Sequence, residues 1–97
     1  MIAFLTLELR IEGAHSLKDK RQAVRSVKDS LRNHFNVAVA ELDATDLWQR
    51  ATLTAALVGR TASIVDDAGI KVGRYVESQF PEGVLIERHL LSTEDLF

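Results

Sequence analysis

The segment SLKDKRQAVRSVKDSLRNH, residues 16–34, decides how the rest of this chain is interpreted. Its apolar residues recur at steps of three, four and seven, a spacing typical of a helix with one buried face. These residues are Leu17, Val24, Val27 and Leu31. Ser16 is expected to be the N-cap, with Asp19 as the acid of a capping box. We therefore predict one amphipathic helix over residues 16–34.

A second row of side chains in the same segment is basic. On a wheel of 100° per residue, the apolar row and the basic row are adjacent arcs of roughly 80° each. The basic row, here called the basic stripe, consists of Lys18, Arg21, Arg25, Lys28 and Arg32. Like charges at this spacing repel one another by a few tenths of a kcal/mol per pair. A stripe of this kind therefore requires a functional explanation or compensating acids.

Three explanations of the basic stripe remain open. The cations could contact the phosphates of a nucleic acid or a ribosome, over a length of about 20 Å at 1.5 Å per residue. They could instead contact an acidic protein. The third explanation is a solvated flank that pairs with acids of a second subunit or of a later helix. The acids of that later helix are Asp66, Asp67 and Glu77.

Lys20 differs from the stripe because it falls inside the apolar arc of the helix. We expect its aliphatic stem to cross the edge of the core and its ammonium group to reach water. The alternative is that Lys20 points at a partner near the preceding loop, residues 14–16.

Hydrophobic periodicity in the rest of the chain predicts four strands and a second helix. Alternation of period two indicates a strand with one buried face, whereas steps of three and four indicate a helix. The strands are predicted over residues 2–12, 37–42, 47–58 and 84–91, and the second helix over residues 61–79 with Thr61 or Ser63 as its cap. The order β-α-β-β-α-β predicts a ferredoxin-like α+β fold, with a four-stranded antiparallel sheet and both helices on one face.

Composition places further limits on the protein. Ninety-seven residues are enough for a single domain, predicted over residues 1–97. The absence of cysteine excludes disulfides and thiolate chemistry, and together with the lack of a long apolar run it favours a cytoplasmic protein without membrane contact. Residues 16–34 hold six basic and two acidic residues, while the remainder holds six basic and twelve acidic ones. This segregation predicts an oriented electrostatic surface.

No pattern in the sequence identifies a reaction, so we predict a non-enzymatic protein without a cofactor or metal. Glu41, Asp43 and Asp46 could hold a hard cation, but their spacing matches no calcium loop and aspartate is common in turns. Trp48 is expected to be a packing anchor, or with Arg50 an exposed recognition patch. The central strands offer few aromatic groups on the open sheet face, so RNA is expected on the helix side instead.

Two blocks of the sequence resemble the bacterial YlxP-like family (domain of unknown function 503). The blocks contain S-L-K-x-K-R at residues 16–21 and D-L-W-Q-R at residues 46–50. The resemblance implies a ferredoxin-like fold and no established activity, and the genes of relatives lie near those of translation and ribosome-maturation factors. It singles out a possible recognition patch, formed by Ser16, Lys20, Asp46, Trp48, Gln49 and Arg50.

Three functional hypotheses follow. The leading one is an accessory protein that binds ribosomal RNA, or a ribosomal particle or protein, through the basic stripe. The second is a homo-oligomeric interaction module, such as a homodimer, joined through strand edges or the open sheet face. The third and weakest is a small-ligand or metal-dependent enzyme at the hairpin between Asp43 and Arg50.

Overall fold

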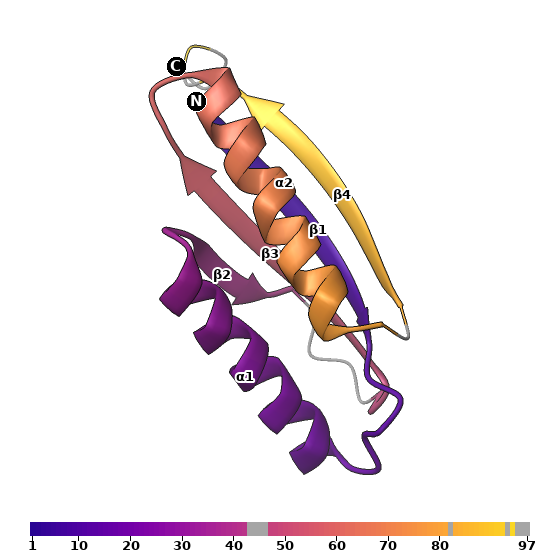
Figure 1. The fold of residues 1–97 in the computed structure, drawn as a ribbon. Coiled ribbons are helices and arrows are strands. Elements are labelled where there is room, and N and C mark those ends of the chain that lie inside the picture. Colours follow the sequence, from indigo (N-terminus) through magenta and orange to yellow (C-terminus); the bar gives the residue numbers. More distant parts are fainter. Residues whose placement is uncertain (43–46, 82, 93, 95–97) are drawn as a thin grey trace.

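The order of helices and strands predicted from the periodicity is confirmed. The computed structural model describes residues 1–42, 47–81, 83–92 and 94. In chain order the elements are β1 (Ile2–Arg10), α1 (Leu17–His34), β2 (Ala38–Glu41), β3 (Arg50–Val58), α2 (Ala62–Gln79) and β4 (Val84–Leu91). Figure 1 shows the chain passing from β1 at one end of the molecule into α1, and returning through β2 and β3 to α2 and β4.

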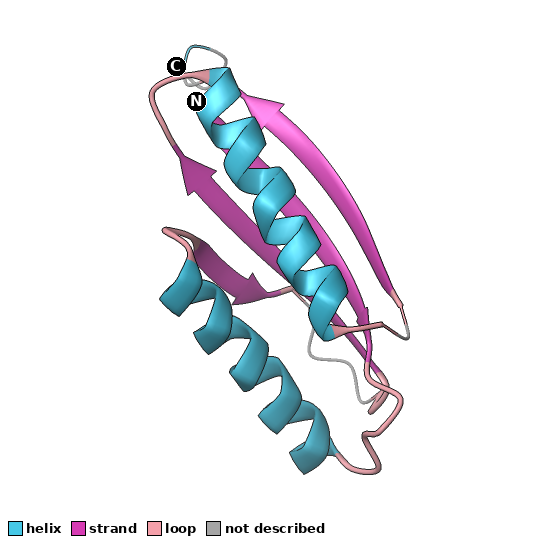
Figure 2. Cartoon of the chain, viewed as in Figure 1, coloured by secondary structure: helices cyan, strands magenta, loops and turns pink. Residues whose placement is uncertain are grey.

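The four strands form one antiparallel sheet in the order β2-β3-β1-β4. β1 is central: it pairs with β3 from Ile2 opposite Val58 to Arg10 opposite Arg50, and with β4 on its other side. Both helices cover the same face of the sheet (Figure 2), which leaves the other face open. This arrangement is the ferredoxin-like fold predicted from the sequence.

Each helix covers its own half of the sheet. α2 packs against β1, β4 and β3, whereas α1 packs against β2 and β3. The N-terminal half of α1 extends beyond the C-terminal end of α2 (Figure 1). Aromatic rings connect the two helices where α1 ends: Tyr75 of α2 lies 4.8 Å from His34 and 5.6 Å from Phe35, measured between ring centroids.

The core lies between the sheet and the helices, and it follows the predicted alternation. On the strands every second residue is buried, because successive side chains point to opposite faces of a sheet. The fully buried large side chains come from both layers: Leu5, Leu7, Leu31, Leu53, Val65, Val72 and Val76. Of the apolar row predicted for α1, Val24, Val27 and Leu31 are buried, and Leu17 is half-buried at the first turn.

Both helices begin at capping residues that the sequence identified. The hydroxyl of Ser16 accepts the backbone N–H of Asp19 at 3.1 Å, which confirms the predicted cap. The Asp19 carboxylate in turn accepts the backbone N–H of His15 at 3.0 Å. In the usual capping box the N–H comes from the N-cap residue itself, which here is Ser16, so the hydrogen bond is shifted by one residue. Of the two candidates for the second cap, Thr61 is correct, since its hydroxyl accepts the backbone N–H of Ile64.

Four predicted strand boundaries are wrong, at the end of β1, at the start of β3 and at both ends of β2. β1 ends at Arg10 rather than residue 12 because the chain turns there: the backbone N–H of Ala14 donates to the carbonyl of Ile11. β3 begins at Arg50 rather than residue 47, and β2 is one residue shorter at each end than predicted. The hairpin predicted at Asp43–Asp46 lies outside the described residues. No helix in the described ranges is long and apolar enough to cross a membrane.

Candidate nucleic-acid interface

The basic stripe lies on the flank of α1 that faces away from α2. The α1 residues that face α2 across the groove between the helices are Ala23, Ser26, Val27 and Ser30. At 100° per residue, the centre of the stripe lies roughly 110° around the helix axis from the buried row, on the side opposite this groove. α1 packs over β2, the edge strand, so the stripe projects past that edge of the sheet.

Most of the stripe carries uncompensated charge. Lys18, Arg21 and Arg25 are exposed and Lys28 is half-buried. Among the residues that the structure describes, none of these four cations makes an ion pair. Their mutual repulsion therefore remains as a small cost to the stability of α1.

The acids of α2 do not neutralise the stripe. Asp66 lies 3.9 Å from Arg88 of β4, on the other side of the molecule. Asp67 and Glu77 form no ion pair with any described cation. The explanation of the stripe as a flank paired with these acids is therefore wrong.

Arg32 differs from the other four cations because its guanidinium group is used within the fold. It donates a hydrogen bond of 2.9 Å to the carbonyl of Val39 on β2, and it lies 3.9 Å from the carboxylate of Asp29. The hydrogen bond covers a carbonyl on an edge strand, where backbone groups otherwise attract other chains. Arg32 is thus a structural residue first, and the other four cations are the stronger candidates for binding.

Lys20 is buried, with 4% of its surface exposed. Its aliphatic stem therefore lies in the apolar row of the helix, as its place on the helical wheel predicts. The buried row of α1 thus contains Lys20 in place of the predicted Leu17; its other members are Val24, Val27 and Leu31. Lys20 also takes part in further interactions. A buried charge of this kind is retained only with partners, so Lys20 has a structural role at the start of α1.

The possible recognition patch is only partly assembled. The Ser16 hydroxyl caps α1 and Lys20 is buried, so the exposed part of the patch comes from the second sequence block. Trp48 is 49% exposed, which makes it a surface group rather than the expected packing anchor. Asp46 lies outside the described residues.

The second sequence block is nevertheless tied to the loop that leads into the first. The carbonyl of Gln49 accepts the backbone N–H of Ile11 at 2.9 Å, and its side-chain amide lies 3.5 Å from the carbonyl of Glu12. This link holds Trp48 and Arg50 at the end of the sheet where β1 leaves for α1.

A cluster that the sequence did not reveal lies at the same end, on the open face. Arg10 and Arg50 stand directly opposite each other on β1 and β3. Neither makes an ion pair within the described part of the chain. The two arginines form a second concentration of positive charge. The arrangement has a cost, because like charges placed directly opposite each other destabilise a sheet.

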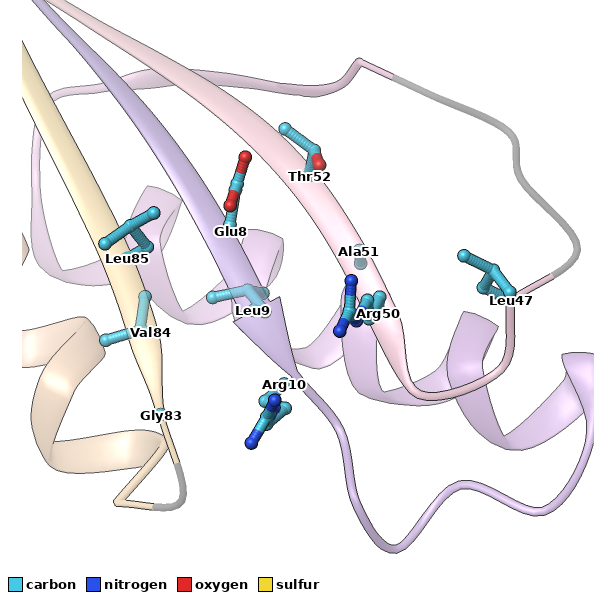
Figure 3. A pocket seen from close by; sticks show the side chains of 10 residues that line it. All are labelled: Glu8, Leu9, Arg10, Leu47, Arg50, Ala51, Thr52, Gly83, Val84 and Leu85. Carbon is cyan, nitrogen blue, oxygen red and sulfur yellow. The ribbon is translucent and has the colours of Figure 1, made fainter.

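The two arginines line a hollow of about 500 Å³. Figure 3 shows Leu47 and Leu85 on opposite sides of this hollow, with Glu8 between the neighbouring strands. Guanidinium groups bind phosphate and carboxylate oxygens in pairs, so the hollow is suited to an anion with an apolar part. Periodicity could not predict this cluster, because the register of β1 against β3 brings the two arginines together.

Comparison with known proteins supports the assignment made from the two sequence blocks. Residues 2–89 match the family described as "Protein of unknown function (DUF503)". The chain belongs to the DUF503 family. It is 34% identical over 94 residues to a relative from Bacillus subtilis (strain 168), "Uncharacterized protein YlxP", and the match covers 97% of this chain and 98% of the relative. The YlxP-like resemblance is thereby confirmed.

Among the described residues, no group of three or more histidine, aspartate or glutamate side chains could hold a metal ion. Two of the three carboxylates considered from the sequence, Asp43 and Asp46, lie outside those residues.

Proposed function

We propose that this DUF503 protein is a non-enzymatic accessory protein that binds ribosomal RNA or a ribosomal particle through the basic stripe of α1. The observation that carries the proposal is the row of four cations, Lys18, Arg21, Arg25 and Lys28, without ion-pair partners in the described part of the chain. The row lies along one continuous helix, which sets the spacing between the cations and suits contacts to the phosphates of a folded RNA.

The size of the expected effect follows from counterion release. If the four cations each neutralise one phosphate, the logarithm of affinity should fall with the logarithm of salt with a slope of about −3. Raising salt from about 50 to 200 mM would then weaken binding roughly 60-fold. Binding of this kind is positioned by phosphates and needs no base-specific contact.

The proposal is tested by measuring the affinity of fluorescently labelled protein for purified small ribosomal subunits at several salt concentrations. The variant R21E/R25E/K28E should bind at least tenfold more weakly and with a shallower salt slope. The matched control R60E/K71E/R74E makes the same change in net charge at three exposed positions before and on α2. It should change the affinity less than threefold.

Two results would refute this function. One is the absence of wild-type binding at low salt. The other is an equal loss of affinity in both triple variants, since that outcome would mean that net charge alone attracts the protein to the particle. Circular dichroism of each variant checks that α1 is still folded.

The arginine pair on the open face supports a second contact for the same RNA. Arg10 ends β1, and a loop over residues 11–16 connects it to α1, so the pair and the start of the stripe lie at one end of the molecule (Figure 1). The variant R10Q/R50Q should weaken binding two- to tenfold if the RNA reaches this face. Unchanged binding would restrict the interface to α1.

A further inference from the structure

The two edges of the sheet differ in how their backbone groups are protected. At one edge, β2 is four residues long and Arg32 covers the carbonyl of Val39. At the other edge, β4 is eight residues long and pairs only with β1 among the described elements. A long regular edge strand attracts other strands unless it carries proline, a bulge or inward-pointing charge.

The hydrogen bonding of β4 shows which backbone groups face outward. The backbone N–H of Arg10 donates to the carbonyl of Gly83 at 3.2 Å, so this opposed pair exchanges hydrogen bonds across the sheet. In an antiparallel ladder such pairs alternate with pairs whose backbone groups point away. We count along the register from this pair. The backbone N–H and C=O groups that point away from β1, toward the open edge, belong to Val84, Ile86, Arg88 and Leu90.

β4 carries charge but few of the other protections of an edge. Arg88 lies opposite the buried Leu5 and so points inward, where it is 3.9 Å from the carboxylate of Asp66. Residues 84–91 contain no proline, and the described chain has no residue other than Gly83 in the left-handed region. Three leucines of the strand are substantially exposed: Leu85 at 60%, Leu90 at 45% and Leu91 at 38%. They occupy both faces of the sheet, which is the arrangement expected when a further strand continues it.

The sequence of β4 is also complementary to itself. In an antiparallel pairing of two copies with the two-fold axis at Arg88, residues whose numbers sum to 176 lie opposite each other. Ile86 then meets Leu90 of the second copy, and Leu85 meets Leu91 of the second copy. Glu87 meets His89 of the second copy, whose ring can donate a hydrogen bond to the carboxylate. This register also makes Ile86 and Leu90 a hydrogen-bonded pair, as their outward backbone groups require.

Neighbouring registers are less favourable. An axis at Glu87 would oppose two carboxylates, which destabilises a strand pair. An axis at His89 would leave the apolar residues at the start of β4 without partners. In the favoured register the two copies of Arg88 meet on the axis, where each already lies 3.9 Å from the carboxylate of Asp66 in its own chain. The two Asp66 carboxylates offset the repulsion between the two Arg88 guanidinium groups.

The surface of α2 beside β4 leaves room for the second copy. Two hollows of about 380 and 310 Å³ lie between α2 and β4, and both are lined by Gly69 and Arg88. Leu90 lines one of them, and Gly73, Ile70 and Ile86 line the other. Two helices that flank the paired strands would close over these hollows and bury the exposed leucine and isoleucine side chains.

We propose that β4 is a homodimer interface, through which two copies of this chain form one continuous eight-stranded sheet centred on Arg88. The interface is separate from the basic stripe, because the stripe lies at the opposite edge of the sheet, and it borders only the hollow beside Arg10 and Arg50, through Leu85. A dimer built in this way keeps both stripes exposed.

The first test is the mass of the full chain in solution, by sedimentation equilibrium across micromolar concentrations. The expected result for the wild-type protein is twice the chain mass of 10.8 kDa. The variant L90K should raise the dissociation constant at least tenfold, since a lysine would enter the paired edge. The control V58K places the same charge at an exposed residue of β3, 74% exposed, and should leave the dimer intact.

The second test examines the register. H89E would oppose two carboxylates at two symmetric positions and should weaken the dimer at least tenfold, while the swapped variant E87H/H89E should restore it. Because the chain has no cysteine, R88C introduces a single thiol on the axis. Hydrogen-bonded antiparallel pairs have Cα atoms about 5.5 Å apart, within the range of a disulfide. R88C should therefore cross-link under mild oxidation, and V58C should not.

The proposal is overturned if the wild-type protein is monomeric at 100 µM, or if L90K dimerises as tightly as the wild type. It is also overturned if V58C cross-links and R88C does not, because that result would place the interface elsewhere on the sheet. Failure of the swapped variant to restore the dimer would overturn the register centred on Arg88.

Discussion

Alanine in place of Gly69 and Gly73 should stabilise this protein, although both glycines are buried in α2. Glycine inside a helix costs about 1 kcal/mol relative to alanine. A Cβ atom at Gly69 would lie 3.7 Å from the nearest atom of Leu5, and a Cβ at Gly73 would lie 3.5 Å from Ile86. Both are ordinary van der Waals distances, so the added methyl groups fit without displacing β1 or β4.

The expected magnitude follows from these two facts. Each substitution should raise the free energy of unfolding by about 0.5–1 kcal/mol, and the double variant G69A/G73A by about 1–2 kcal/mol. For a domain of this size, about 1 kcal/mol corresponds to a rise in Tm of about 4–8 °C. The measurement is urea unfolding at one fixed protein concentration, because self-association would otherwise shift the apparent stability.

Gly59 provides a matched control with the opposite expectation. A Cβ atom at this position would lie 2.8 Å from Cγ1 of Val65, which is 1% exposed and restricted to one rotamer in a helix. G59A should therefore destabilise the protein by about 1–3 kcal/mol through overpacking. If G69A and G73A lower the stability by 1 kcal/mol or more, the packing of α2 on the sheet must be closer than described, and the reasoning fails.

Further expectations concern the caps and the core. S16A and T61A should each lower stability by about 1 kcal/mol, because each removes a hydroxyl that accepts a backbone N–H in the first turn of a helix; thermal unfolding would show this, and no loss in either variant would contradict the capping role. L31A should cost about 2–5 kcal/mol by opening a cavity under α1. Measured by chemical unfolding, I64A should lower the free energy of unfolding much less than L31A does, since Ile64 is 54% exposed.

The fold was predictable because the local patterns agree with the tertiary structure. Alternating leucines in β1 and the spacing of Val24, Val27 and Leu31 identify their elements without knowledge of any contact. The boundaries were less predictable. The end of β1 depends on a turn at Ile11 and on a hydrogen bond to Gln49, and neither feature produces a periodic signal.

The candidate site was predictable only where one helix carries it. The basic stripe follows from helical spacing, since its residues share a flank of α1. The hydrogen bond from Arg32 to Val39 depends on the position of β2. The burial of Lys20 depends on the residues that surround the first turn of α1. The pairing of Arg10 with Arg50 depends on strand register. These features arise between elements, so they require the tertiary structure.

The position of α1 over the short edge strand also has a consequence for dynamics. α2 is held by three strands, whereas α1 packs on β2 and β3 and meets α2 at the aromatic rings of His34, Phe35 and Tyr75. Local opening occurs most easily in the parts of a fold that have the fewest buried contacts. The unit formed by α1 and β2 can therefore open while β1, β3, β4 and α2 stay folded. The helix that carries the basic stripe can then adjust to a partner surface without unfolding the rest of the molecule.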